Sequence, residues 1–381
     1  MSVTLEPHHL CIAGGGPAAL EGALAVQALA EERVRVTLVA PGTTFDYRPL
    51  AVAEPFGLGE VARFSLPGMC AERGFAHARD ALASVDVSRH QATLASGSTV
   101  DYDSLLAAVG ARGEVALPGA LTFRGSEDVA ALRDALTKAN AWTLPLYELA
   151  LMTARWAEQE RLPLEVWLVT HEARALGVFG PEVSARMGDR LDEAGVRLRT
   201  GAFAQAVEDG RLWLDMEGGF PVDLVVTLPR LVGPAISGLP ADQHGFLLVD
   251  AHGRVDGAPD VYAAGDVTTR PLRQGGLATQ QAAAAAAAIA VRAGASVDAG
   301  PYRPALRGLL LTGRRPEYFS REAGGAGEIS EEALWWPPHK IASRHLGPYL
   351  AAHPELRETN ATSSVRPAGR PAAGTTEHTT A

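Results

Sequence analysis

The chain has few cysteines and no surplus of positive charge. Its 381 residues include only two cysteines, Cys11 and Cys70. They lie far apart and form no CxxC motif, so the sequence predicts neither a disulfide framework nor a dithiol redox centre, and a reducing compartment is expected. The formal net charge of -10 argues against nucleic acid as a partner, because phosphate backbones are bound through an excess of Lys and Arg.

Long hydrophobic segments and metal-ligand patterns are also lacking. The longest apolar run, residues 282–291, is nearly all alanine and too short to span a bilayer. The N-terminus has no basic stretch followed by an apolar core, as a signal peptide would. We therefore expect a cytoplasmic protein. His339, His345 and His353 are scattered without metal-ligand spacing to Cys or carboxylates, so we assign no metal.

The chain opens with a pattern typical of a strand, a glycine-rich turn, a helix and a second strand. Residues 10–13 and 34–39 are apolar and predict the two strands. Between them, Gly14, Gly16 and Ala19 form GxGxxA, which permits a tight turn, close approach of a pyrophosphate and close packing of the helix. This predicts a dinucleotide site at a helix N-terminus. The alternative is a glycine-rich turn in another α/β fold, and the acidic residue expected after the second strand is missing.

The rest of the chain alternates strand and helix patterns. A β-rich block from residue 83 to 111 contains an SGS hairpin turn, and from Thr359 onward the absence of apolar periodicity predicts a disordered tail. Helices are predicted at residues 128–139, 146–160, 181–196 and 275–294. Further strands are predicted at residues 164–170, 197–201, 222–229, 246–250 and 260–266.

A second set of motifs lies in the distal half. Asp266 ends an apolar strand, and Gly275 and Gly276 open the alanine-rich helix. Together with GxGxxA and "LLAAVGAR" at residues 105–112, these elements resemble the FAD-binding elements of flavoproteins with two dinucleotide-binding domains, the pyridine nucleotide-disulfide oxidoreductase superfamily. The resemblance extends from Leu10 to about Leu350.

Within that superfamily, the chain looks most like the type II NADH dehydrogenase and sulfide:quinone oxidoreductase branch. Four segments carry this resemblance: "VTLVAPGTTFDYRPL", "WTLPLYELALMTARW", "ALGVFGPEVSARM" and "LWWPPHKIASRHLGPYL". It implies an α/β fold in which a Rossmann-like FAD-binding domain is made of two sequence segments. The implied domains are residues 1–118 and 237–311 for FAD, an inserted degenerate NAD(P)-binding-like domain at 119–236, a C-terminal element at 312–358 and the disordered tail at 359–381.

The resemblance also implies noncovalent FAD and a set of residues around it. Asp266 would bind a ribityl hydroxyl, and Leu277 would lie at a helix N-terminus beside the pyrimidine edge, where the helix dipole stabilises the negative charge of reduced flavin. The only candidate for proton transfer is Lys340. The expected cofactor-binding residues are Gly14, Gly16, Pro17, Ala18, Ala19, Arg48, Pro49, Gly110, Gly265, Asp266, Leu277 and Ala278.

Two departures from the family pattern limit the functional prediction. A sulfide-oxidising member needs a cysteine pair at the flavin face, and this chain cannot supply one. A nucleotide-binding middle domain should begin with its own strand, glycine turn and helix, yet residues 140–145, "NAWTLP", contain no glycine and are too short for a strand and a phosphate-binding turn. The NAD(P) site is therefore predicted to be eroded, and the sequence favours FAD over NAD(P).

The predicted function is an FAD-dependent oxidoreductase that passes two electrons from a donor through flavin to a quinone or another acceptor. The alternative is a flavin-binding redox sensor or assembly protein without turnover. The implied partners are a small-molecule donor and acceptor and a second copy of the chain in a homodimer. Trp335, Trp336, Lys340 and Tyr349 could form a peripheral membrane contact or pack on the FAD domain. Gln280 and Gln281 could bind a quinone headgroup or lie on the helix surface.

Overall fold

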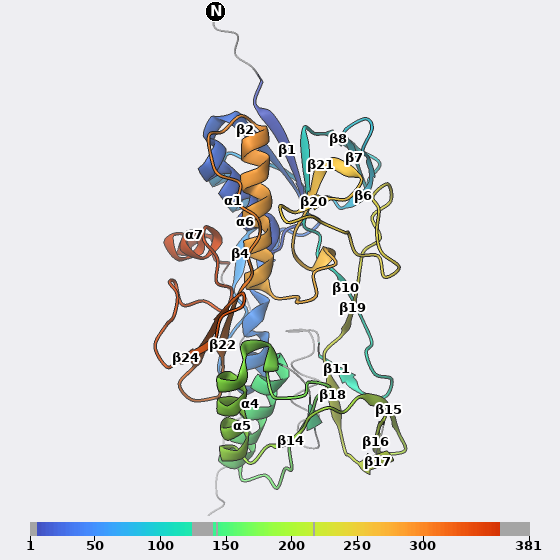
Figure 1. The fold of residues 1–381 in the computed structure, drawn as a ribbon, viewed down its shortest axis with the longest axis vertical. Coiled ribbons are helices and arrows are strands. Elements are labelled where there is room, and N and C mark those ends of the chain that lie inside the picture. Colours follow the sequence, from blue (N-terminus) through green and yellow to red (C-terminus); the bar gives the residue numbers. More distant parts are fainter. Residues whose placement is uncertain (1–5, 124–139, 142–143, 216–217, 359–381) are drawn as a thin grey trace, which may run out of the picture.

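The computed structural model describes residues 6–123, 140–141, 144–215 and 218–358. The helix expected at residues 128–139 and the disordered tail expected from residue 359 lie outside these residues. Figure 1 shows two lobes stacked along the long axis, each built on a parallel sheet. The α/β fold predicted from the sequence is confirmed.

The upper sheet has β1 near its middle. The chain passes from β1 (His8–Ala13) to β2 (Val34–Val39) and β5 (Ala76–Ala78) on one side, and later adds β9 (Ser104–Ala107) and β21 (Ala258–Ala263) on the other. These neighbours are parallel, and a short antiparallel β20 (Arg254–Val255) closes the edge. The strand order therefore reverses beside β1, which is where open α/β sheets bind their ligands.

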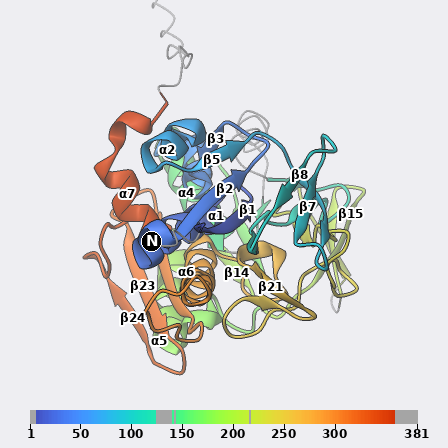
Figure 2. The same cartoon turned by 90° about the horizontal axis from the view of Figure 1, so that it is seen from above.

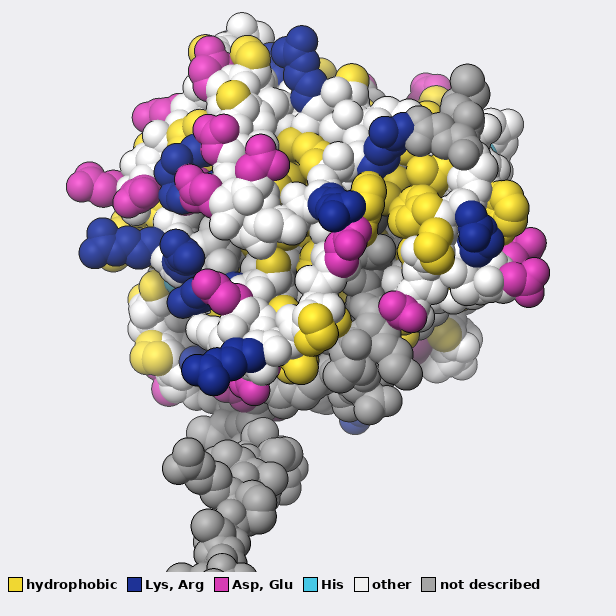
Figure 3. All heavy atoms as spheres, turned by 90° about the horizontal axis from the view of Figure 1, so that it is seen from below, with side chains coloured by type: hydrophobic (Ala, Val, Ile, Leu, Met, Phe, Trp, Pro, Cys, Tyr) yellow, Lys and Arg dark blue, Asp and Glu magenta, His cyan; other side chains and the backbone are white. Residues whose placement is uncertain are grey.

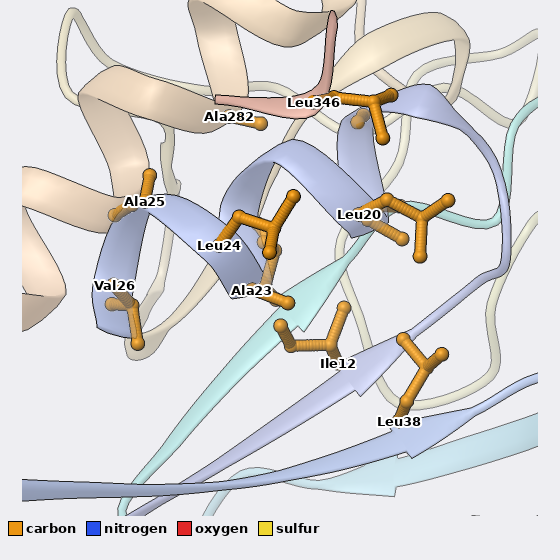
Figure 4. Close-up of a cluster of buried hydrophobic side chains, with 14 of the residues drawn as sticks. Ile12, Leu20, Ala23, Leu24, Ala25, Val26, Leu38, Ala282 and Leu346 are labelled. Carbon is orange, nitrogen blue, oxygen red and sulfur yellow. The ribbon is translucent and has the colours of Figure 1, made fainter. Parts of the chain in front are cut away.

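Two helices cover one face of this sheet. α1 (Pro17–Ala30) and α6 (Gly275–Arg292) lie side by side, as Figures 1 and 2 both show. In Figure 4, Ala23 and Leu20 of α1 lie on the side that faces Ile12 and Leu38 of the sheet, and all four side chains are buried. The contact between α1 and α6 is formed largely by alanine side chains, whose small size allows the two helix axes to approach closely. The alanine-rich run is therefore a buried packing helix rather than compositional bias.

The other face of the sheet is covered by an antiparallel hairpin sheet. It consists of β6 (Leu82–Asp86), β7 (Gln91–Leu94) and β8 (Thr99–Asp101), and the amide of Leu94 donates to Ser98 across the predicted SGS turn. Cys11 is fully buried against this face. The prediction of a β-rich block is thus confirmed.

The strand predicted at residues 246–250 is wrong. Leu247 and Val249 make only isolated bridges, each to a different segment. Aspartate side chains form turns at both ends of the stretch. Asp242 accepts hydrogen bonds from the amides of His244 and Phe246, and Asp250 accepts them from the amides of His252 and Arg254. Such Asx turns compete with strand pairing, and the apolar pattern alone does not reveal them.

The lower sheet repeats the upper arrangement. Its strand order is β11-β18-β12-β13-β14, all parallel, and α4 (Leu144–Glu160) and α5 (Pro181–Glu193) connect the central strands. A two-residue strand, β12, forms at the start of the segment 140–145, where the sequence predicted no strand, and the segment remains too short for a strand and a phosphate-binding turn together. β12 forms because it pairs with strands on both sides. The strands are β11 (Leu121–Thr122), β12 (Asn140–Ala141), β13 (Trp167–Val169), β14 (Arg197–Arg199) and β18 (Val225–Thr227).

Smaller elements attach to these lobes. Three short strands, β15 (Ala204–Glu208), β16 (Arg211–Leu214) and β17 (Gly218–Pro221), form an antiparallel sheet on the lower lobe. Two chain segments connect the lobes. They lie side by side because β10 (Arg112–Glu114) in one pairs with β19 (Arg230–Val232) in the other (Figure 1). Between β2 and β5 the chain forms β3 (Thr44–Asp46), a 3-10 helix η2 (Arg48–Phe56), β4 (Arg63–Ser65) and α2 (Leu66–Arg73).

The C-terminal element packs along both lobes. β22 (Ala305–Leu310), β23 (Glu317–Glu322) and β24 (Gly327–Ser330) form an antiparallel sheet, followed by α7 (Leu346–Ala352). This sheet crosses the boundary predicted at residue 311, and the domain boundaries as a whole stay a prediction. Among the described residues, no helix is long and apolar enough to cross a membrane. On the lower face in Figure 3, acidic and basic side chains are interspersed.

Candidate functional site at the first strand ends

The first glycine of the turn after β1 is required by its surroundings. Gly14 has φ +131, which L side chains rarely adopt, and a Cβ added there would lie 2.2 Å from the carbonyl oxygen of Ala108. Its amide donates a 2.8 Å hydrogen bond to the carbonyl of Val39. The turn therefore packs tightly against the ends of β9 and β2, where only glycine fits.

The next part of the turn leaves space in front of α1. A Cβ added at Gly16 would meet no protein atom within 4 Å. Gly16 is also the N-cap of α1, without any side-chain cap, and the first helical bond runs from the Leu20 amide to the Gly16 carbonyl. Pro17 has no amide hydrogen, and the amides of Ala18 and Ala19 have no acceptor within the helix. These donors and the positive end of the helix dipole favour an anion in the open space.

The end of β21 and the start of α6 reach the same place. Gly265 has φ +80, and a Cβ added there would lie 3.3 Å from the Cβ atoms of both Ala18 and Ala278. α6 also begins without a side-chain cap, at Gln274. Two long helices, of 14 and 18 residues, therefore point their uncapped N-termini at one point beside the strand ends.

An unpartnered carboxylate lies at this point. Asp266 follows Gly265, and within the described part of the chain its side chain makes no hydrogen bond. Burial raises the pKa of Asp266, and the guanidinium of Arg273 opposes that shift. Asp266 is half-buried, and a carboxylate without a partner in the protein is an acceptor available to a ligand.

The structure brings most of the predicted cofactor-binding residues together. Gly14, Ala18, Gly265 and Ala278 lie around the strand ends, and the others in α1 and α6 are their immediate neighbours. Gly110, with φ +76, follows β9 two residues after Ala108. Arg48 is exposed and opens η2 together with Pro49, and neither residue is among the atoms nearest to Gly14, Gly16 or Gly265.

Lys340 forms a buried ion pair that the sequence did not predict. Its Nζ lies 2.7 and 2.6 Å from the two carboxylate oxygens of Glu148, on α4, and the amide of Leu311 donates to the same carboxylate at 2.9 Å. The Glu148 side chain is 1% exposed and that of Lys340 10%. Burial raises the pKa of Glu148, while the Lys340 ammonium and the Leu311 amide act in the opposite direction.

The segment that carries Lys340 lies against the start of α6. Thr279 Oγ1 donates to the carbonyl of Ala342, and a Cβ on Gly275 would come within 2.9 Å of the Ile341 side chain. The Ile341 amide donates to the hydroxyl of Tyr47, directly before η2, at 2.7 Å. Lys340 is therefore anchored beside the α6 N-terminus.

A second buried glutamate holds the same C-terminal segment. Glu21 is the fifth residue of α1, as Glu148 is the fifth of α4, and its carboxylate accepts hydrogen bonds from the amides of Arg344, His345 and Leu346. Burial raises the pKa of Glu21, and these amides oppose the shift. The only sequence signal for either glutamate is an acidic residue among apolar neighbours in a helix.

The two glutamines and part of the aromatic segment make contacts within the protein. Gln280 forms two hydrogen bonds with the backbone of Ala305, and Gln281 accepts the amide of Gly265, so both amides are used within the protein. Trp335 packs edge-on against Tyr318, whereas Trp336 is 83% exposed. The segment before α7 is irregular, and its predicted basic edge is absent because Lys340 is buried in an ion pair.

Neither cysteine lies at the strand ends that form this site. Cys11 and Cys70 are buried and unpaired, and burial raises the pKa of Cys11 to about 12 and that of Cys70 to about 11. No metal-binding cluster of His, Cys, Asp or Glu is found within the described residues. An open hollow of about 570 Å³ beside residues 254–259 lies at the far end of β21 from Gly265, so it does not belong to the site.

The fold and the site define a protein with two α/β units of dinucleotide-binding type, the first with intact glycine turns. Residues 8–287 match the family described as pyridine nucleotide-disulphide oxidoreductase. The chain belongs to this family, as the sequence motifs predicted.

Individual relatives agree with this assignment. The ferredoxin–NAD(+) reductase component of the biphenyl dioxygenase system of Paraburkholderia xenovorans is 31% identical over 214 residues, which is 50% of this chain and 50% of that protein. The chain thus matches half the length of this curated relative. The structure of sulfide:quinone oxidoreductase from Aquifex aeolicus has a TM-score of 0.73 and 17% identity, covering 95% of this chain and 100% of that one. A ferredoxin reductase from Rhodopseudomonas palustris has a TM-score of 0.63 and 22% identity, covering 85% and 91%.

Proposed function

We propose that this protein is a flavin-dependent oxidoreductase that holds FAD noncovalently where α1, β21 and α6 meet. One observation carries the proposal: two uncapped helix N-termini converge on Gly265, beside the unpartnered carboxylate of Asp266. A ligand that satisfies both helices and the carboxylate needs negatively charged groups and hydroxyl donors. The pyrophosphate and ribityl groups of FAD supply both.

The predicted residues have separate roles in this proposal. The pyrophosphate would lie in the open space at Gly16, facing the amides of Ala18 and Ala19. Asp266 would accept a hydrogen bond from a ribityl hydroxyl. The pyrimidine edge of the flavin would lie at the start of α6, beside Leu277 and Ala278. The remaining expected contacts are Gly14 and Pro17 in the first turn, Gly265 at the end of β21, and Gly110, Arg48 and Pro49 along the flavin.

When bound, FAD supplies the capacity to accept two electrons and pass them on. The chain contributes orientation and electrostatics. The positive end of the α6 dipole stabilises negative charge at its N-terminus. The segment that carries Lys340 lies against that N-terminus, and the Lys340 ammonium is held by the Glu148 carboxylate. The acceptor in this proposal is a quinone or another small electron carrier.

Substitution at Gly16 tests the cofactor site directly. In Gly16→Val the new side chain meets no protein atom near its Cβ but enters the space assigned to the pyrophosphate. The variant should fold, with an unchanged far-ultraviolet circular dichroism spectrum, and should lose most of its bound flavin. Gly188→Val is the matched control, because Gly188 on α5 also has open space around it, and this variant should keep its flavin. Full flavin occupancy in Gly16→Val would refute the assigned site.

Electron transfer is tested separately from binding. The flavin is reduced photochemically without oxygen and then mixed with a soluble benzoquinone. Reoxidation within seconds, repeated each time the flavin is photochemically reduced again, supports the oxidoreductase. A flavin that stays reduced with quinone and with a reducible ferredoxin would favour the noncatalytic sensor instead, which the altered second nucleotide unit already makes a reasonable alternative.

A further inference from the structure

The second α/β unit can be compared with the first inside the same chain. In both, the first strand is flanked by the second strand on one side and by a later strand on the other. The structural equivalents are therefore β1, α1 and β2 in the upper lobe and β12, α4 and β13 in the lower. A dinucleotide bound in the second unit would lie outside the carboxyl ends of β12 and β13, at the start of α4.

The sequence before α4 lacks the glycines that precede α1. Three residues, all glycine, separate β1 from α1, whereas two residues, neither of them glycine, separate β12 from α4. The third residue of α1 is Ala19, the small residue that permits close packing, and the third residue of α4 is Leu146. Leu146 is fully buried in one cluster with Leu168 of β13 and Val226 of β18.

Tyr147 occupies the place where the two strand ends would face a ligand. Its ring is fully buried, and its hydroxyl donates a 2.8 Å hydrogen bond to Glu172, just beyond the end of β13. The amide of Leu176 donates to the same hydroxyl at 3.3 Å, and the Leu176 side chain is buried in the same cluster. One side chain of α4 thus fastens the loop after β13 over the start of the helix.

Glu172, the acidic residue that follows β13, is hydrogen-bonded within the protein. In dinucleotide sites of this fold, a carboxylate after the second strand binds ribose hydroxyls. Here Glu172 accepts hydrogen bonds from the hydroxyls of Tyr147 and Thr170 on the same oxygen, the second at 3.1 Å. The protein's own hydroxyls stand where those of a ribose would bind.

We infer that the second dinucleotide unit has been filled by the chain's own side chains, and that Tyr147 is the residue that closes it against NAD(P). The residues present do not fit the nicotinamide cofactor that the family name implies. For the oxidoreductase proposed above, on which this consequence rests, the donor class is one that carries electrons without a pyridine dinucleotide.

The first test adds NADH or NADPH, each at millimolar concentration, to the flavin-loaded protein without oxygen. The flavin absorbance band should stay unchanged over minutes with both, while dithionite bleaches it at once and shows that the flavin is reducible. Bleaching by either nucleotide, at a rate that saturates with its concentration, would overturn the inference.

A second readout does not depend on flavin. The melting temperature should not move when ADP, NAD+ or NADP+ is added at millimolar concentration, and a rise of several degrees with any of them would overturn the inference. A colourless protein would defeat the proposed function but leave this measurement valid. The two proposals can therefore fail separately.

The role of Tyr147 has its own measurement. Tyr147→Phe keeps the ring but removes the acceptor that the Leu176 amide has among the described residues, so hydrogen exchange at Leu176 should accelerate at least tenfold. Tyr102→Phe is the matched control, because the buried Tyr102 hydroxyl has no partner among the described residues, and Leu176 should exchange at its original rate. Unchanged exchange in Tyr147→Phe would refute Tyr147 as the closing residue.

Discussion

Removal of the Lys340 ammonium should show how much the buried ion pair with Glu148 contributes to the stability of the fold. In Lys340→Met, Glu148 keeps a fully buried carboxylate with only the Leu311 amide as a partner. Breaking one side of a buried pair costs about 3–5 kcal/mol. At roughly 2.1 cal/mol/K per residue, cooperative unfolding of this chain has an entropy of about 0.8 kcal/mol/K, so the melting temperature should fall by about 4–6 °C.

A second substitution should restore most of that loss. Glu148→Gln, combined with Lys340→Met, removes the orphaned charge and retains a carbonyl oxygen for the Leu311 amide, so the double variant should melt within about 2 °C of the parent. Arg230→Met is the control, since Arg230 pairs with Glu114 on the surface, where the two side chains are 68% and 49% exposed. A surface pair of this kind contributes about 1 kcal/mol or less, or about 1 °C here.

The loss in Lys340→Met should depend on pH with a defined sign. Without the ammonium, burial raises the pKa of Glu148 in the folded state above its unfolded value, so the folded protein binds the proton more tightly. Stability from this group is present at low pH and is lost as the pH rises above the ordinary glutamate range. The deficit should therefore grow between about pH 5 and pH 8, measured by differential scanning calorimetry with saturating FAD. A loss of less than about 1 °C that does not change with pH would refute the reasoning.

Three further predictions follow from the site. Gly14→Ala should give protein without flavin, because its Cβ would collide with the Ala108 carbonyl, and normal flavin content would contradict this. Glu21→Gln should speed hydrogen exchange in α7 about tenfold, because one charge-assisted bond is worth about 1.5 kcal/mol more than none; exchange at the parent rate would show that Glu21 does not anchor α7. Cys11 and Cys70 should react with a thiol reagent at pH 8 only after unfolding, since burial raises both thiol pKa values, and rapid native labelling would disprove their burial.

Several elements could be predicted from the sequence because their signals are local. GxGxxA between two apolar runs specifies β1, α1 and β2, and the structure has the second strand at the predicted bounds, Val34–Val39. The run after Gly275 is a helix for the same reason, since alanine favours helix over its whole length. Each signal lies within about 30 residues, so no distant partner is needed to recognise it.

The predictions that failed depended on distant partners. The stretch at residues 246–250 has the right apolar residues but makes only isolated bridges to neighbouring segments, because carboxylates turn the chain on both sides. β12 was missed for the opposite reason, since its two residues become a strand only between β13 and β18. Strand formation depends on pairing, and local composition does not report it.

By itself, the sequence determined the family, the first nucleotide-binding unit and the absence of a glycine turn in the second, because backbone freedom and helix propensity are properties of neighbouring residues. Only the tertiary structure decided how the missing turn was replaced. Tyr147 meets Glu172 across 25 residues and Lys340 meets Glu148 across 192, and each contact exists only because the fold buries both partners together. The role of a buried charge or hydroxyl depends on its hydrogen-bonding partner, and the packing of the whole chain determines which partner that is.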